Sequence, residues 1–306
     1  MKHNVKITLL LLSMFFITQL IGLLVISKYS PEVKQITDAS GNVTNVTSYN
    51  LPYGMDPPEG VTPQSTLISI VFAIAIAVFL MLLLMKYRAE IFLRVWFFVV
   101  VVLALGITFN SFFFNYVYSP IIAVIVALPI AFFKIFKRSI IVHNVSELLI
   151  YPGIAAIFVP LLNIWSIVLL LILISAYDIY AVWHAGFMQK MAQYQIEKVK
   201  IFTGFFVPYL GKKERAEIKK AKLSKSKDKN VKVSLAILGG GDVVFPLILA
   251  GVVLNTLGLF QALIVTIFST IALAYLFYTS EKGKFYPAMP FITTGSFIGL
   301  LIAYLI

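Results

Sequence analysis

Two aspartates are the residues of this sequence most able to do chemistry, because each lies inside a long apolar stretch. Asp178 lies in LILISAYDIYAVW, and Asp242 follows three glycines in LAILGGGDVVFPLILA. A carboxylate at the centre of a membrane helix costs roughly 2.5 kcal/mol or more, so acids in such positions are rare and usually functional. Two carboxyls held together can divide acid and base work, one taking a proton from water while the other protonates a leaving group.

Composition indicates that these stretches are membrane spans. The 306 residues are 60% hydrophobic and 12% charged, whereas soluble domains are about 25% charged. Several runs approach the roughly 20 apolar residues that cross a bilayer, and the first run is too long for a signal-peptide core. The sequence therefore predicts an all-α polytopic membrane protein. Its nine predicted transmembrane helices lie near residues 5–27, 65–85, 92–109, 117–133, 144–162, 164–187, 233–254, 257–279 and 287–306.

The basic residues orient these spans. With the N-terminus placed in the cytoplasm, 23 of the 25 Lys and Arg residues fall on the cytoplasmic side, and only Lys28 and Lys34 fall outside. Basic residues concentrate on the cytoplasmic side of membrane proteins. The prediction is a cytoplasmic N-terminus and an extracytoplasmic C-terminus. The net charge of +12 is explained by this flank and requires no nucleic-acid partner.

The spacing of the spans divides the chain into three parts. Residues 1–187 form a six-span block, 188–232 a lysine-rich segment, and 233–306 a three-span block. High charge and low hydrophobicity favour a mobile cytoplasmic loop for 188–232, which could also bind anionic lipid. An external loop at 28–64 carries glycosylation sequons at Asn42 and Asn45, whose use the sequence leaves open.

The predicted topology brings the two aspartates to one depth. Asp178 lies nine residues before the inner end of the sixth span, and Asp242 nine residues after the start of the seventh. At 1.5 Å per residue both lie roughly 14 Å above the cytoplasmic face. Facing carboxyls at this depth match the pair of an aspartic protease. The glycines before Asp242 would let water and an extended peptide approach, although small residues also serve close helix packing.

Three motifs in order carry a resemblance to a known family. Tyr177-Asp178, Gly239-Gly240-Gly241-Asp242 and Pro287-Ala288-Met289 resemble the YD, GxGD and Pro-Ala-Leu motifs of the presenilin and signal-peptide-peptidase family of intramembrane aspartyl proteases. Met289 stands where that family has leucine. The resemblance covers nearly the whole chain and is closest to a small prokaryotic, archaeal-type presenilin homologue. GxGD alone also occurs in type IV prepilin peptidases.

The resemblance implies a function and a site. Asp178 and Asp242 would be the catalytic pair of an aspartic endopeptidase that hydrolyses transmembrane segments within the bilayer. The substrates would be single-span membrane proteins or signal peptides, and no cofactor is implied. The site-shaping residues would be Tyr177, Gly239, Gly241, Pro287, Ala288 and Met289. The sequence names no substrate or partner subunit and leaves open whether the chain forms homo-oligomers.

Other functions would also use paired membrane acids. A proton- or cation-coupled transporter could bind its ion there, and a scaffold or ion leak could have the same cavity. A zinc site is not expected, because the chain lacks cysteine and its three histidines, His3, His143 and His184, are scattered.

Three further expectations concern single residues. Tyr177 either donates a hydrogen bond to the acid pair or packs in the interior. Glu147, near the start of the fifth span, is expected to snorkel to the interface. Pro287 is expected at the first position of the last helix, where its missing N–H is not needed.

Overall fold

The secondary structure is mostly helical. A computed structural model describes residues 5–37, 43–48, 51–55, 62–137, 139–185, 194, 201, 203–209, 234–280 and 286–306. Within them the α-helices are α1 (Val5–Lys28), α2 (Pro63–Lys86), α3 (Glu90–Phe112), α4 (Ser119–Phe136), α5 (Ile140–Phe158), α6 (Ile164–Tyr180), α9 (Gly240–Thr256), α10 (Leu259–Thr279) and α11 (Met289–Leu305). The strands are β1 (Glu32–Thr37), β2 (Val43–Ser48), β3 (Gly204–Tyr209) and β4 (Ser234–Gly239).

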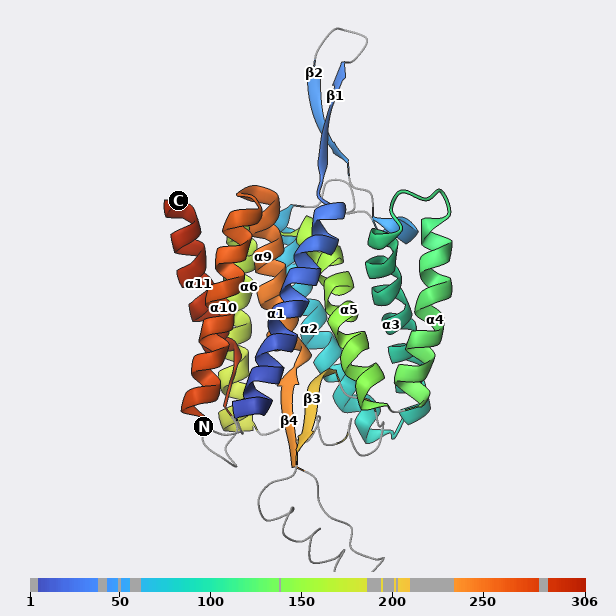
Figure 1. The fold of residues 1–306 in the computed structure, drawn as a ribbon, viewed down its shortest axis with the longest axis vertical. Coiled ribbons are helices and arrows are strands. Elements are labelled where there is room, and N and C mark those ends of the chain that lie inside the picture. Colours follow the sequence, from blue (N-terminus) through green and yellow to red (C-terminus); the bar gives the residue numbers. More distant parts are fainter. Residues whose placement is uncertain are drawn as a thin grey trace, which may run out of the picture.

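These helices form one bundle of antiparallel, membrane-length elements (Figure 1). Seven of them are long and apolar enough to cross a membrane, while α9 and α11 are apolar but have 17 residues each. In Figure 1, α1 begins at the end of the bundle where β3 and β4 lie, and α11 finishes at the other end. The chain is an integral, multi-pass membrane protein with one helix for each predicted span in the described residues.

Two antiparallel hairpins lie at opposite ends of the bundle (Figure 1). β1 pairs with β2 beyond one end, where the sequence predicted only a loop. β3 pairs with β4 at the other end, in the register Gly204 with Gly239 and Tyr209 with Ser234. The prediction of a loop throughout 188–232 is therefore wrong for β3. Most of that lysine-rich segment, and the sequon residue Asn42, lie outside the described residues.

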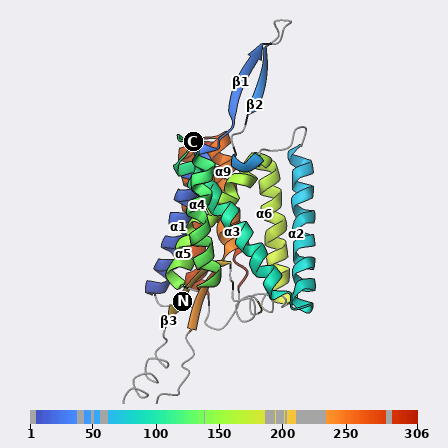
Figure 2. The ribbon, with the colours of Figure 1, turned by 90° about the vertical axis from the view of Figure 1, so that its right-hand side faces the viewer.

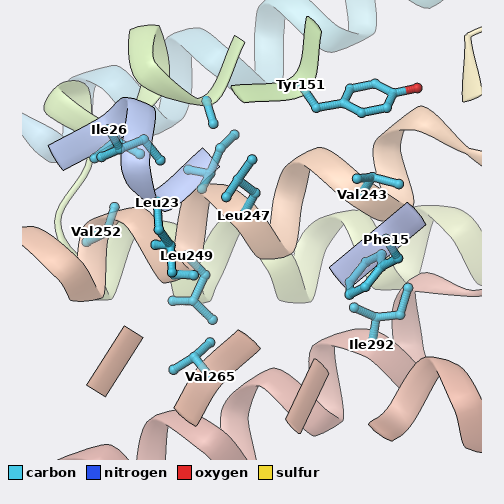
Figure 3. Close-up of a cluster of buried hydrophobic side chains, with 14 of the residues drawn as sticks. Phe15, Leu23, Ile26, Tyr151, Val243, Leu247, Leu249, Val252, Val265 and Ile292 are labelled. Atoms are coloured by element: carbon cyan, nitrogen blue, oxygen red, sulfur yellow. The ribbon is translucent and has the colours of Figure 1, made fainter. Parts of the chain in front are cut away.

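The main core is centred on α9. Its fully buried side chains include Val243, Leu247 and Leu249, which meet Phe15 and Leu23 of α1 and other residues from α5, α6, α10 and α11 (Figure 3). A second cluster joins α3, α4 and α5. α2 lies at the edge of the bundle beside α6 (Figure 2), and no residue in its most apolar window is buried. The helix that carries Asp242 is thus surrounded by protein on most sides.

Glycines let two of the helix pairs approach closely. A Cβ atom added at Gly153 of α5 would collide with the backbone carbonyl of Ala104 on α3. One added at Gly295 of α11 would lie 2.6 Å from the carbonyl oxygen of Phe268 on α10. Small residues at helix crossings are typical of membrane proteins, where packing replaces the hydrophobic effect between helices.

Candidate active site

Asp178 lies near the C-terminal end of α6, and its side chain is buried, with 7% exposed. Its Oδ2 accepts a hydrogen bond of 3.0 Å from the backbone N–H of Met289, and the backbone N–H of Ala288 donates to the same carboxyl. Ala288 is the N-cap of α11 and Met289 its first residue. Asp178 therefore binds two of the backbone donors that the start of α11 cannot satisfy within the helix.

Asp242 is the third residue of α9, which begins at Gly240 after the N-cap Gly239. Its carboxyl turns back and accepts the backbone N–H of Gly239, as the third residue of a capping box does. The prediction of a helix from Val233 is wrong here, because Ser234–Gly239 forms β4 instead. Strand pairing with β3 satisfies the backbone of this segment, so the helix starts at the glycines and Asp242 lies in its first turn.

The structure brings the two aspartates together at the starts of two helices. Asp178 and Asp242 are close enough to interact electrostatically. The half-buried Asp242 lies in the first turn of α9, and Asp178 lies at the first turn of α11. Helix N-termini favour negative charge because their free N–H groups and dipoles point toward it. Each carboxyl thus accepts backbone N–H groups at the start of a helix.

Proline loosens the helix just after Asp242. Pro246 lies four residues beyond Asp242, inside α9. Because proline has no N–H, the carbonyl of Asp242 has no donor at the usual position in the next turn. The backbone of the Asp242 turn is therefore available for polar contacts from outside the helix.

The three glycines before Asp242 have different surroundings. A Cβ atom at Gly239 would lie 3.1 Å from Asp242 Oδ2, and one at Gly240 would lie 2.8 Å from the Tyr151 hydroxyl on α5. One at Gly241 would meet only Phe245 of its own helix, at 3.6 Å. The closest approach from another helix is thus at Gly240, the position that the GxGD pattern leaves variable. Ala288 of the last helix is not among these nearest neighbours.

The Pro287-Ala288-Met289 segment lies at Asp178, but not in the expected helix register. α11 begins at Met289, so Pro287 precedes the N-cap and Pro290 occupies the early helical position. The prediction that Pro287 starts the helix is wrong, because the N–H groups of the next two residues are directed to Asp178. One turn further along α11, Thr293 accepts a hydrogen bond of 2.9 Å from Ser175 of α6. This bond fixes the same two helices on the other side of the carboxyl.

Tyr177 is half-buried on α6 and interacts electrostatically with Asp178. Its two expected roles, hydrogen-bond donor and packing residue, remain alternatives. Of the histidines, His143 lies on α5, while His3 and the side chain of His184 lie outside what the structure describes. No group of three His, Asp or Glu side chains able to hold a metal ion is found within the described residues.

Glu147 does not snorkel to the interface, and that prediction is wrong. Its side chain is buried, with 1% of the residue exposed, and pairs with the buried Lys134 of α4. His143 completes the cluster: its Nδ1 lies 3.3 Å from Lys134 Nζ and its Nε2 lies 2.8 Å from the carbonyl oxygen of Gly204. A carbonyl can only accept, so Nε2 carries the hydrogen and Nδ1 accepts from Lys134. The basic partner on the neighbouring helix offsets the desolvation cost of burying Glu147.

This cluster also attaches β3 to α5. Besides the bond from His143, Asn144 makes two bonds to the backbone of Phe206: its Nδ2 donates to the carbonyl at 2.9 Å, and its Oδ1 accepts the N–H at 3.2 Å. The Asn144 side-chain amide therefore pairs with Phe206 of β3 in the way that the backbone of a neighbouring strand would. Because β3 pairs with β4 and β4 leads into α9, these bonds help to place the Asp242 turn.

Two residues near Asp242 were not identified from the sequence. Gln19 of α1 is fully buried and its Nε2 donates a hydrogen bond of 2.9 Å to the carbonyl oxygen of Val243. Tyr151 of α5 lies over Gly240. A polar residue inside the first apolar run was a usable signal for Gln19. Tyr151 gave no such signal, because tyrosine is common in membrane helices.

Comparison with known proteins gives the family. The sequence model of the family described as "Signal-peptide peptidase, presenilin aspartyl protease" matches residues 52–306. No curated protein matches the chain. Two solved structures, both of "a presenilin family intramembrane aspartate protease", have the same fold. The one in a C222 crystal form has a TM-score of 0.60 at 18% identity and covers 97% of this chain and 98% of its own. The P2 form has a TM-score of 0.61 at 17% identity, covering 96% of each chain.

The family match spans α2 to α11 and includes both aspartates, the glycines and the Pro287-Ala288-Met289 segment. α1 and the β1–β2 hairpin lie before the matched residues, and the structural match extends over them. On this evidence the chain belongs to the signal-peptide peptidase and presenilin family of aspartyl proteases.

Proposed function

We propose that the chain is a GxGD-type intramembrane aspartic endopeptidase whose catalytic pair is Asp178 and Asp242. The observation that carries the proposal is the meeting of these two carboxyls at the first turns of α11 and α9. Membership of the protease family supports the reaction. The positions of the carboxyls, each held by backbone donors, support their role in it.

The chemistry divides between the two carboxyls. With one ionised and one protonated, the ionised carboxyl takes a proton from a water molecule, whose oxygen attacks the peptide carbonyl carbon. The protonated carboxyl donates its hydrogen to the carbonyl oxygen. Transfer of a proton to the leaving amine then breaks the C–N bond. Water supplies both the new C–O bond and the protons, so no cofactor is consumed.

A peptide bond within a helix must be exposed before it can be hydrolysed. β4 leads directly to Asp242 and lies in a two-stranded sheet with β3. Its second edge therefore has no strand partner among the described residues, and Ile237 in this strand is 41% exposed. An extended peptide can pair with such an edge through backbone hydrogen bonds. We infer that the substrate segment unwinds and lies along β4, with its scissile bond at the aspartates.

The proposal is tested by cleavage of a model single-span substrate with purified protein. Wild type is expected to cleave it, and a transition-state-type inhibitor of aspartic proteases is expected to block cleavage. Asp178→Asn and Asp242→Asn provide inactive, nearly isosteric controls. Cleavage that persists in either variant would refute the assignment, and ion flux into liposomes that depends on the aspartates would favour a transporter.

The orientation and the three-part organisation of the chain belong to the same proposal. We propose a cytoplasmic N-terminus, with the 188–232 segment and the β3–β4 end of the bundle facing the cytoplasm. Because the chain has no native cysteine, single cysteines can be introduced and labelled from one side. Labelling of a cysteine in the β1–β2 hairpin from the cytoplasmic side would contradict this orientation.

A further inference from the structure

A stripe of polar side chains on α5 ends at the catalytic turn. His143, Glu147 and Tyr151 are four residues apart, so they lie along one face of the helix. His143 and Glu147 belong to the buried cluster with Lys134. Tyr151 lies one turn beyond Glu147, and Figure 3 shows it reaching from α5 alongside Val243 of α9.

The ring of Tyr151 is held rigidly. The residue is 3% exposed, and its ring packs edge-on against Phe205 of β3, with centroids 5.7 Å apart and an interplanar angle of 81°. Phe205 is itself fully buried. On the opposite side, Gly240 leaves space for the hydroxyl, because a Cβ atom there would lie 2.8 Å from it. The ring therefore directs its hydroxyl at the first turn of α9.

The hydroxyl of Tyr151 makes no hydrogen bond of normal length and angle within the described residues, although the Glu147 carboxyl is close enough to attract it. A buried polar group without a partner is destabilising, and nearly all such groups in native proteins are paired. Tyr29, a comparably buried tyrosine, shows the usual arrangement. Its hydroxyl donates to the Ile107 carbonyl at 2.7 Å and accepts from Asn110 at 2.8 Å.

Charged groups surround this hydroxyl on two sides. Its stronger electrostatic neighbour is Glu147 on its own helix, whose carboxyl also competes as a hydrogen-bond acceptor, and Asp242 on α9 interacts with it as well. Glu147 is already paired with Lys134 of α4, with His143 beside them, whereas Asp242 interacts with Asp178 and the backbone N–H of Gly239 and has no basic partner among the described residues. Asp242 is thus the nearby carboxyl whose charge is not already neutralised by a described base. Catalytic hydrogen bonds are often long before substrate binds and shorten in the reacting complex.

We propose that Tyr151 is a positioning residue of the active site, whose hydroxyl donates a hydrogen bond to the Asp242 carboxyl when substrate is bound. This inference rests on the proposed function. The bond would hold the orientation of the carboxyl and favour one of its protonation states during the reaction. The rigid ring, Phe205 and Gly240 would fix the direction of the donor.

The test is Tyr151→Phe, which removes only the hydroxyl, with Tyr29→Phe as the matched control. Cleavage kinetics, thermal unfolding and the pH–rate profile are measured for both. A hydrogen bond to a charged group is strong enough to change kcat roughly tenfold to a hundredfold. We expect Tyr151→Phe to lower kcat by this factor without changing KM or thermal stability, and to displace the pH–rate profile. Tyr29→Phe should unfold at a lower temperature while keeping its kcat and its profile.

The outcomes separate this inference from the proposed function. If Asp178→Asn or Asp242→Asn still cleaves, the proposed function itself fails. If both are inactive but Tyr151→Phe has the kcat and pH–rate profile of wild type, only the role of Tyr151 is refuted. A loss of stability in Tyr151→Phe as large as that in Tyr29→Phe would also refute it, because the hydroxyl would then have a structural partner.

Discussion

Among the described residues, two groups of charged side chains lie inside the helix bundle, and they differ in how their charges are compensated. In the Lys134–Glu147–His143 cluster, a base and an acid from adjacent helices neutralise each other, and His143 links them to the backbone of β3. In the Asp178–Asp242 pair, two acids lie together and receive backbone N–H groups at two helix starts. The first group thus contains a base beside its acid, while the second contains two acids.

This difference matches the structural role of the cluster and the chemical role that we propose for the aspartates. A buried ion pair holds its surroundings in place but has nothing to exchange with a substrate. Two like acids remain together only if a proton is shared, so the proton stays available for transfer. The two groups also cooperate, because the cluster anchors β3, and β3 pairs with the strand that ends at Asp242.

The largest effect is expected from removal of either aspartate. Asp178→Ala or Asp242→Ala should lower cleavage by roughly a thousandfold or more, because acid and base work are no longer divided. The variants should still fold. Removing one acid of the pair leaves a single carboxyl, which can stay protonated, so no unpaired charge is buried. Substrate cleavage and thermal unfolding are measured together. Loss of the fold in both variants would show that the pair is structural.

For the Lys134–Glu147–His143 cluster we expect a loss of stability rather than a loss of catalysis. Glu147→Ala leaves Lys134 buried without its partner, which should destabilise the protein by about 3–5 kcal/mol. Its activity should fall only as the folded fraction falls. Replacing both members, as in Lys134→Met with Glu147→Leu, should recover most of the stability, because apolar residues of similar volume need no partner. Unfolding temperatures that are equal in the single and double variants would contradict this interpretation.

The pH dependence of cleavage should be bell-shaped. At low pH both carboxyls are protonated and neither takes a proton from water, whereas at high pH both are ionised and neither donates one. Activity should fall about tenfold per pH unit on each limb, as expected for a pair that titrates in two steps. The measurement is kcat/KM against pH within the range where the wild type stays folded. A flat profile would assign the chemistry to other groups.

A smaller effect is expected at the start of α11. Met289→Pro removes the N–H that Asp178 accepts and should lower kcat roughly tenfold. Proline suits a first helical position but disfavours the αR conformation of the preceding Ala288, so thermal unfolding is measured beside kcat. Ala288→Leu should also reduce activity without unfolding, because a larger side chain at the N-cap displaces the donors of the carboxyl. Met289→Leu should be nearly silent, since leucine and methionine have similar volumes. Full activity in Met289→Pro would remove this hydrogen bond from the site.

Much of the fold could be predicted from the sequence because apolar length is a local property. Each predicted span corresponds to a helix, and the two membrane acids were identified from their apolar surroundings. The main boundary error lies before Asp242. β4 replaces the start of the predicted seventh helix, and apolar residues there suit a buried strand as well as a helix. The sixth span continues beyond α6 as the π-helical turn Ala181–Ala185.

What the sequence determined by itself was the membrane class, a helix for each apolar run and the two acids, since each depends on a run of neighbouring residues. The tertiary structure decided which polar groups meet. It placed Lys134 against Glu147, directed two N–H groups of α11 to Asp178, and set Tyr151 over Gly240. Such contacts join helices that are distant in the chain. Their energy depends on mutual distance and burial, which no local pattern encodes.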